Sequence, residues 1–376
     1  MGADEIWKHS TGKGVKVAVI DTGVNPNTSS LRGQVLVDEV PKAAKYHVTQ
    51  DYDGHGTSMA ELIAGTGAGG GIKGLAPGAK IIPIRVGLDQ MKDERERLRS
   101  LDSPQAIRAA ADTDAKIINM SYGSEFPDEA EQAAVKYAAS KGKLLFAATG
   151  NDGAKGNKAN YPAMYPYVVG VSAIDRHATV GKFSTYGNQV DFSAPGIEVP
   201  TWCDATFTRY CRTFGTSNAS AIASASAALV WSAHPDWTAN QVLRSFIDTA
   251  GRSWPKNKPS KYLGYGVIRP RRVLIAKDID PGPANRDPLA AENGTAPDED
   301  ITATGGSSAA PSSSPSSGAS AKPSKEAGSA DGPTSAAAQD TASGGGTRTW
   351  VIIGAAAAVL ILGGAGFAVL RARRNA

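Results

Sequence analysis

Several features that mark metal-binding and nucleic-acid-binding proteins are scarce in this sequence. Its 376 residues include only two cysteines and five histidines, without a Cys-x-x-Cys or His-x-x-x-His spacing, so no metal site is predicted. The net charge of +4 is too small to predict a nucleic-acid partner. A glycine-rich run at residues 67–71 lacks the Gly-x-x-x-x-Gly-Lys-Ser/Thr pattern of a phosphate-binding loop, and we interpret it as an ordinary loop.

Large hydrophobic residues are almost absent from residues 281–349. This stretch has no aromatic residue, and Leu289 and Ile301 are its only large aliphatic residues. Such a composition buries too little apolar surface to offset the entropy lost on ordering. We therefore predict a disordered linker rich in Pro, Ser, Ala and Gly over residues 280–349. The preceding residues, 1–279, have the mixed composition and the length of one large α/β domain.

Charge is absent from residues 350–370, which are mostly apolar. As a helix they would extend about 31 Å at 1.5 Å per residue, roughly the thickness of a bilayer core. Three arginines follow directly, and the positive-inside rule then places the C-terminus in the cytoplasm. We predict a single transmembrane helix at 350–370, a basic cytoplasmic tail at 371–376 and an extracytoplasmic domain at the cell membrane. The alternative is a buried core helix, which the preceding linker disfavours.

The two cysteines, Cys203 and Cys211, are eight residues apart. In an exported domain such a pair predicts a short disulfide loop, whereas in a cytosolic protein it would be two reduced thiols. Export requires a signal peptide, but no basic and apolar leader precedes the first strand-like run at residue 15. We favour the disulfide, and we hypothesise that the native product starts upstream of Met1.

Alternating strand and helix patterns run through residues 1–279. Short runs rich in β-branched residues predict buried parallel strands at 15–20, 81–86, 117–120, 144–148 and 168–172. Helical patterns lie at 57–64, 104–112 (with Ser103 as N-cap), 129–140 and, in a run of small residues, 218–233. The charged residues 89–99 are interpreted as a solvated loop or an exposed helix. The alternation predicts an α/β fold with a central sheet flanked by helices.

Three short segments carry residue types suited to nucleophilic catalysis. Asp21 ends the first predicted strand, where α/β folds place their sites, although an aspartate there is more often a turn or cap residue. His55 opens a helix, whose positive end disfavours imidazolium and so suits a general base. Ser217 opens another helix, where free backbone N–H groups can stabilise an oxyanion; alone, it could be a plain N-cap.

Taken together, these segments resemble the three signatures of the subtilisin family of serine peptidases. The matching runs are Asp21-Thr-Gly, His55-Gly-Thr and Gly215-Thr-Ser217, in the chain order Asp, His, Ser of subtilisin. The resemblance implies a subtilisin-like three-layer sandwich with a mostly parallel central sheet. It also implies endopeptidase activity on proteins or peptides through the triad Asp21, His55 and Ser217, without a cofactor or metal.

Two further segments resemble family elements that line the active site. Residues 147–151 resemble the segment with the oxyanion asparagine, which gives that role to Asn151; the alternative is a plain Asn-Asp-Gly turn. Residues 119–123 resemble the strand and turn that pair with substrate. The substrate-binding residues that the resemblance implies are Ser121, Tyr122, Gly123 and Asp152. The resemblance also implies a pocket for the P1 side chain of the substrate. Its lining or rim would be formed by Tyr122, Thr149, Asp152 and Asn160, and Asp152 would favour a basic P1 side chain.

Within the family, the chain resembles the mycosins, membrane-anchored peptidases of type VII secretion systems in actinobacteria. Its opening Ala3-Asp-Glu-Ile-Trp-Lys, its linker and its predicted C-terminal span all fit this branch. The resemblance implies cleavage of secreted proteins and a link to a type VII secretion complex. The alternative is a non-catalytic component that uses the fold as a scaffold, which the intact triad and Asn151 disfavour.

The sequence departs from common family patterns at a few positions near the triad. Glu61 replaces a glycine on the helix that His55 opens, and we expect it to crowd or charge the flank of the site. Ala221 and Ala225 stand where proline and glycine are usual. Alanine is the best helix former, so these two changes should be tolerated.

Overall fold

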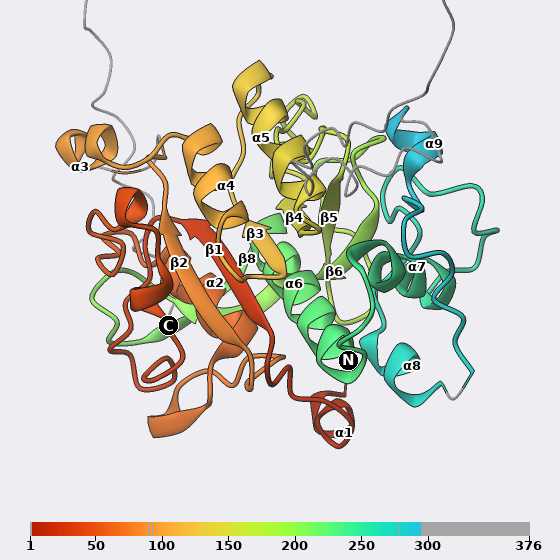
Figure 1. The fold of residues 1–376 in the computed structure, drawn as a ribbon, viewed down its shortest axis with the longest axis horizontal. Helices are drawn as coiled ribbons and strands as arrows, with labels where there is room; N and C mark the ends of the chain where they lie inside the picture. Colours follow the sequence, from red (N-terminus) through yellow and green to blue (C-terminus); the bar gives the residue numbers. More distant parts are fainter. Residues whose placement is uncertain (1, 89–90, 92, 277, 295–376) are drawn as a thin grey trace, which may run out of the picture. The chain divides into compact units, whose positions relative to one another are not determined.

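Six strands form a parallel sheet in the order β2-β1-β3-β4-β5-β6, shown in Figure 1. The computed structural model describes residues 2–88, 91, 93–276 and 278–294. The strands are β1 (Lys16–Asp21), β2 (Lys80–Arg85), β3 (Ile117–Met120), β4 (Leu144–Ala148), β5 (Val168–Ile174) and β6 (Phe192–Pro195). The chain passes from β1 to β2 and then back across β1 to β3. This reversal creates a crevice at the carboxyl ends of β1 and β3, where such folds bind ligands.

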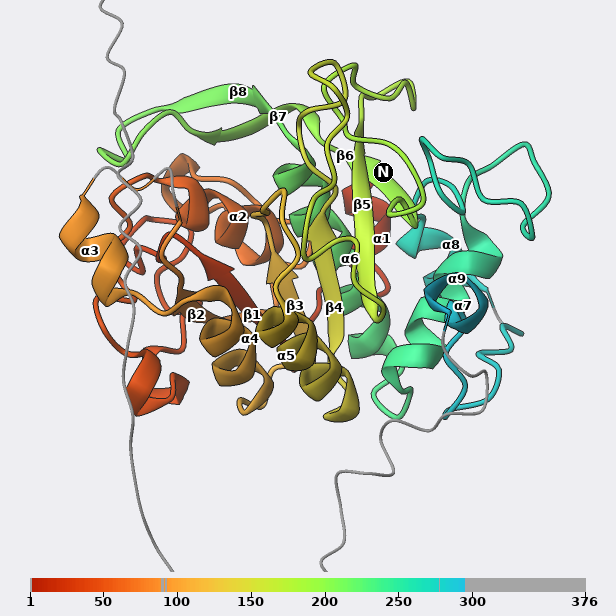
Figure 2. The same cartoon turned by 90° about the horizontal axis from the view of Figure 1, so that it is seen from above.

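Helices cover both faces of the sheet, as Figure 2 shows from above. On one face α2 (His55–Ala64) and α6 (Thr216–Ala233) share a core cluster with inward residues of β1, such as Val17 and Val19. On the other face α4 (Ser103–Ala111) and α5 (Glu129–Ser140) pack with Ala18 and Ile20. The smaller helices are α1 (Ala3–Trp7), α3 (Glu94–Arg99), α7 (Ala239–Thr249), α8 (Pro270–Ile275), α9 (Ala290–Asn293), η1 (Val37–Glu39), η2 (Lys42–Ala44) and η3 (Ala68–Gly70).

The predicted α/β architecture is confirmed, and most element boundaries lie within two residues of their expected positions. Strands β3 and β4 and helix α5 have the predicted bounds. Helices α2 and α6 each begin two residues earlier than predicted, which places His55 and Ser217 inside the first turn. Strand β6 and the antiparallel hairpin of β7 (Ile197–Trp202) and β8 (Tyr210–Phe214) were not predicted. Strand β8 has no fully buried residue, so it lacks the apolar pattern that marks the others.

The predicted N-cap of α4 was wrong by one residue. Asp102 holds that position, and its carboxylate accepts a hydrogen bond from the Gln105 backbone N–H at 2.8 Å. The Gln105 side chain returns a bond to the Asp102 backbone, which completes a capping box. Ser103 is the first helical residue instead, and its hydroxyl bonds to the Tyr122 hydroxyl at 2.7 Å and to Glu131.

The charged residues 89–99 include the exposed helix α3, yet one of its side chains reaches the core. Glu96 accepts a hydrogen bond at 2.7 Å from Arg85, whose side chain on β2 is wholly buried. Tyr46 and His47 also bond to the Glu96 carboxylate, each at 3.0 Å. Burial raises the pKa of Glu96, but these three partners outweigh burial and lower the pKa to about 2. The ion pair therefore fastens α3 to the sheet.

Glu61 does not face the catalytic residues. It is fully buried, and its carboxylate accepts hydrogen bonds from Thr28 Oγ1 at 2.7 Å and from the Tyr210 hydroxyl at 2.9 Å. Tyr210 belongs to β8, so the bond fastens the β7–β8 hairpin to α2. The carboxylate of Glu61 is thus bound to Thr28 and to the hairpin, and its expected effect on the flank of the site stays a prediction.

Replacing Tyr210 with phenylalanine should lower the free energy of unfolding by about 1.5–3 kcal/mol, the usual cost of removing a hydrogen bond to a charged group. The change leaves one oxygen of the buried Glu61 carboxylate without its donor. Urea unfolding of the purified protein measures the effect. Tyr262→Phe is the matched control, because that ring is 50% exposed and should change stability little. Equal stabilities of the two variants would contradict the role given to Glu61.

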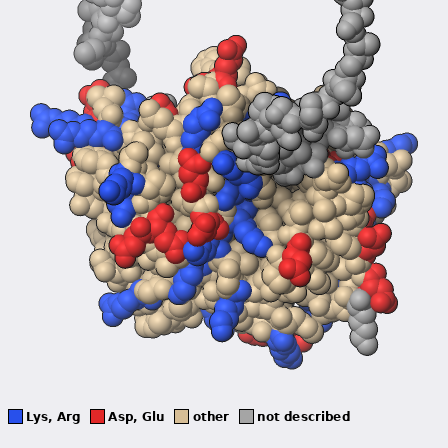
Figure 3. Space-filling model, in the orientation of Figure 1, with Lys and Arg blue, Asp and Glu red and all other residues tan. Residues whose placement is uncertain are grey.

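No helix among residues 2–294, apart from the few positions left undescribed there, is long and apolar enough to cross a membrane. The predicted span at 350–370, the tail at 371–376 and most of the predicted linker lie outside the described residues. On the face shown in Figure 3, basic and acidic side chains are interspersed and neither sign dominates.

Candidate active site

Asp21 and His55 meet at the carboxyl end of β1, where the strand order reverses. Asp21 is the last residue of β1 and is completely buried. The Nδ1 atom of His55, the first residue of α2, lies 2.7 Å from Asp21 Oδ1. The imidazole itself remains 27% exposed. An Nδ1–H donated to the carboxylate leaves Nε2 as the basic atom, which is the tautomer a general base requires.

Two motif glycines allow α2 to approach β1 this closely. A Cβ atom on Gly56 would lie 2.2 Å from the carbonyl oxygen of Gly23 and 3.0 Å from the Cβ of Asp21. Gly23 has a φ of 113°, and a Cβ there would lie 2.4 Å from the Gln50 carbonyl oxygen. Neither position accepts a larger residue without moving the backbone. The glycines in Asp-Thr-Gly and His-Gly-Thr are therefore needed to set the distance from Asp21 to His55.

Asp51 organises the start of α2. Its Oδ2 accepts hydrogen bonds from the backbone N–H and the hydroxyl of Thr57, at 2.8 and 2.6 Å. Its Oδ1 accepts from the Gly54 N–H and from the Thr22 hydroxyl, both at 2.8 Å. Thr22 directly follows Asp21, so the buried Asp51 joins the histidine helix to the aspartate strand. An acidic residue just before a helix start is a capping signal that could have revealed this role.

The charge state of His55 is set by several carboxylates. Burial lowers the pKa of His55, while the charge and hydrogen bond of Asp21 raise it. The charges of Asp53 and Asp51 raise it further, and the net result is a pKa of about 9. The sequence suggested that the helix N-terminus would favour neutral imidazole, but the surrounding carboxylates dominate. A base of this kind becomes neutral, and therefore active, only as the pH rises toward 9 and above.

The Asp53→Asn variant should shift the acidic limb of the kcat/KM profile to lower pH. Removing this negative charge lowers the pKa of His55, so the neutral base appears at a lower pH. The measurement is kcat/KM for a chromogenic peptide between pH 5 and 11. Asp236→Asn is the control, because it removes the same charge from an exposed position that does not affect His55. An unchanged limb would contradict the electrostatic role of Asp53.

Ser217 lies in the first turn of α6 and is held by β3. Its hydroxyl donates to the Ser121 carbonyl oxygen at 2.9 Å, and in this rotamer it makes no hydrogen bond to His55 among the described residues. The Ser121 hydroxyl in turn donates to the Ser217 carbonyl oxygen at 3.1 Å. Catalytic hydrogen bonds are often long or absent without substrate, and rotation about the serine Cα–Cβ bond redirects the hydroxyl.

A buried amide explains the serines of α6. Asn119 on β3 donates from Nδ2 to the Ser121 hydroxyl at 2.9 Å. Its Oδ1 accepts from the hydroxyls of Ser220 and Ser224, both at 3.1 Å. These bonds satisfy polar groups that have no access to water, and they fix α6 against β3. The nucleophile helix is therefore held in register with the strand that precedes Ser121.

Asn151 follows β4 and lies beside the start of α6. Its Oδ1 accepts hydrogen bonds from the Thr216 N–H at 3.0 Å and from the Thr216 hydroxyl at 3.1 Å. These two bonds orient the amide, and its Nδ2 donates to no acceptor in the part of the chain that the structure describes. The free N–H group can therefore serve an oxyanion together with the backbone N–H of Ser217.

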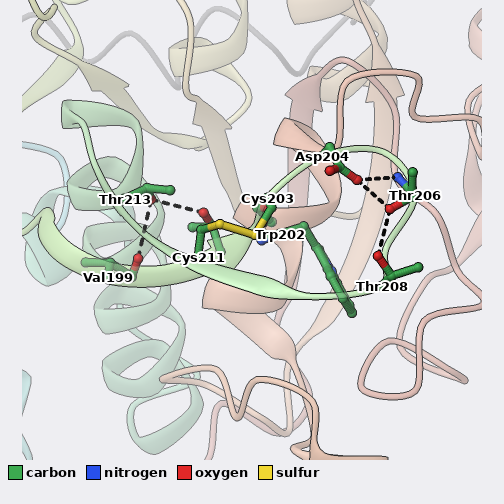
Figure 4. The surroundings of a disulfide bond; sticks show 10 residues. Val199, Trp202, Cys203, Asp204, Thr206, Thr208, Cys211 and Thr213 are labelled. Carbon is green, nitrogen blue, oxygen red and sulfur yellow. Dashed lines mark hydrogen bonds between the residues drawn. A yellow bond between two sulfur atoms is a disulfide. The ribbon is translucent and has the colours of Figure 1, made fainter.

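A pocket of about 260 Å³ collects the predicted catalytic groups. His55, Asn151 and Ser217 line it, and Asp21 lies behind His55. The β7–β8 hairpin forms one wall, to which Trp202 and Cys203 contribute. Figure 4 shows the predicted disulfide between Cys203, directly after β7, and Cys211 in β8. The sequence did not predict that this disulfide borders the pocket, because the hairpin itself was not predicted.

The predicted substrate-binding residues differ in how they contact the catalytic groups. Ser121 contacts Ser217, and Tyr122 is anchored at its hydroxyl by Ser103. A Cβ on Gly123 would lie 2.2 Å from the Asn160 side chain, so these two pack closely beside β4. None of the four predicted substrate-binding residues, Ser121, Tyr122, Gly123 and Asp152, is among the residues that line the pocket. The structure does not test their roles, which remain predictions. The described residues contain no group of three His, Cys, Asp or Glu side chains able to hold a metal ion.

A parallel α/β sheet with an aspartate, a histidine and a serine at its switch point has the arrangement of a serine peptidase. Residues 12–266 match the model of the subtilase family, Peptidase S8, and the chain belongs to that family. A thermostable alkaline protease of Halalkalibacterium halodurans is 38% identical to it over 267 residues, which cover 70% of this chain and 68% of that protein. The protein is accordingly a serine endopeptidase.

Solved structures of mycosins are also similar to this chain. MycP1 from Mycobacterium smegmatis superposes with a TM-score of 0.58 and 27% identity, covering 75% of this chain and 84% of MycP1. The MycP3 protease from the type VII (ESX-3) secretion system gives a TM-score of 0.58 and 29% identity, covering 73% of this chain and 86% of MycP3. The resemblance to mycosins in the sequence is therefore matched by a resemblance in structure.

Proposed function

We propose that this chain is a membrane-anchored, mycosin-like endopeptidase that cleaves secreted proteins by a Ser-His-Asp acyl-enzyme mechanism. The observation that carries the mechanism is the 2.7 Å contact of His55 Nδ1 with Asp21, next to a pocket shared by His55, Ser217 and Asn151. Acyl transfer requires a base oriented by a carboxylate, a nucleophile and a donor for the oxyanion, and the presence of these three features supports the proposal.

In the acylation half-reaction, the Ser217 hydroxyl turns from the Ser121 carbonyl toward His55. As Oγ attacks the carbonyl carbon of the scissile peptide, His55 Nε2 takes its proton. The carbonyl oxygen becomes an oxyanion that the Asn151 amide and the Ser217 N–H stabilise. When the tetrahedral intermediate collapses, the C–N bond breaks and His55 gives the proton to the leaving amine. The acyl group stays on Ser217 as an ester.

Deacylation repeats these steps with water as the nucleophile. His55 takes a proton from the attacking water and returns it to Ser217 Oγ when the ester C–O bond breaks. The buried Asp21 holds the imidazole in the required tautomer and stabilises the imidazolium in both halves. Asp51 acts on these steps by positioning the start of α2, and its charge also raises the pKa of His55.

Asn151→Ala should lower kcat by about 10²–10³, with a much smaller change in KM. That magnitude was measured in subtilisin, a member of the same family. The donor contributes most when the oxyanion has formed, so its loss raises the barrier rather than weakening substrate binding. Steady-state hydrolysis of a peptide p-nitroanilide separates the two constants. Asn188→Ala, outside the pocket, is the control. A loss confined to KM would contradict the oxyanion role.

The proposed location rests on the sequence and on the mycosin likeness. The uncharged residues 350–370 would anchor the chain, with the peptidase domain outside the cell membrane and the C-terminus in the cytoplasm. MycP1 and MycP3 support a link to type VII secretion and to substrates that pass through it. Deleting residues 350–376 should move the protein from the membrane fraction to the soluble fraction. Retention in the membrane fraction would contradict the anchor.

Covalent labelling by a fluorophosphonate tests the catalytic proposal directly. The purified full chain should be labelled at one residue, which peptide mapping should identify as Ser217. Ser217→Ala should abolish the label while leaving the circular dichroism spectrum unchanged. If the folded wild-type chain takes no label at pH 9 and above, where His55 is neutral, the proposed mechanism fails.

A further inference from the structure

A groove of about 860 Å³ lies away from the catalytic residues, between β7 and α8, and is also lined by the end of β5 and by α6. We call it the arginine groove. Strand β7 separates it from the active-site pocket, because Ile197 and Val199 line the groove while Thr201 and Trp202 line the pocket. A ligand in the groove would therefore not touch the catalytic residues.

The floor of the arginine groove is apolar and only partly covered. Ile197, Ile222 and Val267 line it and are neither fully buried nor fully exposed. Ile275 on α8 is 42% exposed at its edge, and Pro200 is exposed as well. These side chains form one concave apolar surface rather than scattered single contacts. Covering such partly accessible apolar side chains with a partner is favourable by about 25 cal/mol per Å².

Four arginines surround this floor. Arg176, Arg269, Arg271 and Arg272 all line the groove and are all exposed. The only carboxylates in the lining are Asp175 and Glu198, so positive charge exceeds negative charge by two. Within the described part of the chain, none of the four arginines forms an ion pair with a carboxylate.

Neither acidic residue of the lining forms an ion pair with an arginine in the described part of the chain. Asp175 uses its Oδ1 for the backbone N–H groups of His177 and Thr179, both at 2.8 Å. These bonds hold the pKa of Asp175 below its usual value, so it stays ionised within its own turn. Arg176 donates from Nε to His177 and not to a carboxylate. The arginine forks are therefore available to an outside partner, and they match planar carboxylates in two-point hydrogen bonds.

We propose that the arginine groove docks an extended acidic segment of a partner protein, with apolar side chains on the floor and carboxylates against the arginines. The concave shape favours a peptide segment over a membrane surface, which is flat on this scale. In an extended chain, side chains alternate between two sides, so acidic and apolar residues in alternation reach the rim and the floor together. The groove would thus hold a substrate or an assembly partner away from the scissile bond.

The test measures binding of a fluorescein-labelled octapeptide in which glutamate alternates with leucine. The full chain, inactivated by a fluorophosphonate if it is labelled by one, is titrated against the peptide and followed by fluorescence anisotropy. We expect saturable binding that weakens with salt. The double variant Arg271→Glu/Arg272→Glu should weaken it about tenfold or more, because two attractive pairs become repulsive. Ile275→Ser should weaken it without changing the salt dependence.

Controls separate the groove from general charge effects. Arg32→Glu/Arg286→Glu makes the same charge change at exposed positions outside the groove and should leave binding within twofold of wild type. A peptide in which lysine alternates with leucine should prefer the Arg271→Glu/Arg272→Glu variant. Neither double variant should alter hydrolysis of a short chromogenic peptide, which shows that the fold is intact. The binding measurement needs no turnover, so it remains informative if the catalytic proposal fails.

Three outcomes would overturn the proposal. The first is a wild-type chain that does not bind the acidic peptide, or binds it equally when serine replaces leucine. The second is an equal loss of binding in both double variants. The third is a chain that ignores the peptide and instead binds phosphatidylglycerol nanodiscs through Arg271 and Arg272, which would assign the groove to a lipid surface.

Discussion

Ser217→Ala is expected to lower kcat by about 10⁶, and His55→Ala should lower it by about the same factor. The double variant should be no slower than either single variant. The reason is that the serine is a poor nucleophile without the base, and the base has no proton to remove without the serine. These magnitudes come from the corresponding variants of subtilisin, a family member, and they apply here because the same three groups meet at one pocket.

The measurement is single-turnover and steady-state hydrolysis of a peptide p-nitroanilide, with active-site titration to exclude a contaminating peptidase. Ser232→Ala is the matched control, since it makes the same change near the other end of α6, where the hydroxyl bonds only to the Lys13 carbonyl oxygen. If the two losses multiplied in the double variant, Ser217 and His55 would be acting independently, and the triad mechanism would be wrong.

Asp21→Asn carries the second-largest expected effect, a loss of about 10⁴ in kcat. An amide at this position cannot stabilise the imidazolium, and it favours the wrong tautomer of His55. The substitution also removes the carboxylate that raises the pKa of His55 most. The acidic limb of the pH profile should therefore move to lower pH while kcat falls.

A fall in kcat together with a shift of the acidic limb distinguishes an orienting carboxylate at Asp21 from a merely structural one. A structural defect would lower the amount of active enzyme without moving the pH limb of the remaining activity. Asp38→Asn, which removes a charge from η1, is the control and should leave both kcat and the limb unchanged. A fall in kcat with an unmoved limb would mean that Asp21 does not set the electrostatics of His55.

The strands and the catalytic motifs could be predicted because their signals are local. The strand β3 and the strand β4 were predicted to the residue, since both are fully buried and rich in large apolar side chains. The motif glycines are also local signals, and Gly56 shows why, because any Cβ there would collide with the backbone after Asp21. Errors at helix starts were small, as with Asp102 and Ser103, because neighbouring residues can compete for the same cap.

The β7–β8 hairpin could not be predicted from such local signals. Strand β8 has no buried residue and β7 has only Val199 and Thr201 buried, so neither is the continuous apolar run of the central strands, and the hairpin packs on α2 through contacts such as Tyr210 with Glu61. Those partners are 149 residues apart. A wall of the active-site pocket and one side of the arginine groove are formed by this hairpin. Sequence patterning reports a segment's own periodicity, and it holds no information about a surface made by distant segments.

From its sequence alone, this protein's family, its α/β class and the identity of its candidate catalytic residues could be established. Only the tertiary structure decided how those residues are tuned. The capping of α2 by Asp51, the pKa of about 9 for His55 and the orientation of Asn151 by Thr216 all depend on groups brought together from separate segments. Electrostatic and hydrogen-bonding energies depend on distances in space, and folding sets those distances between residues that are far apart along the chain.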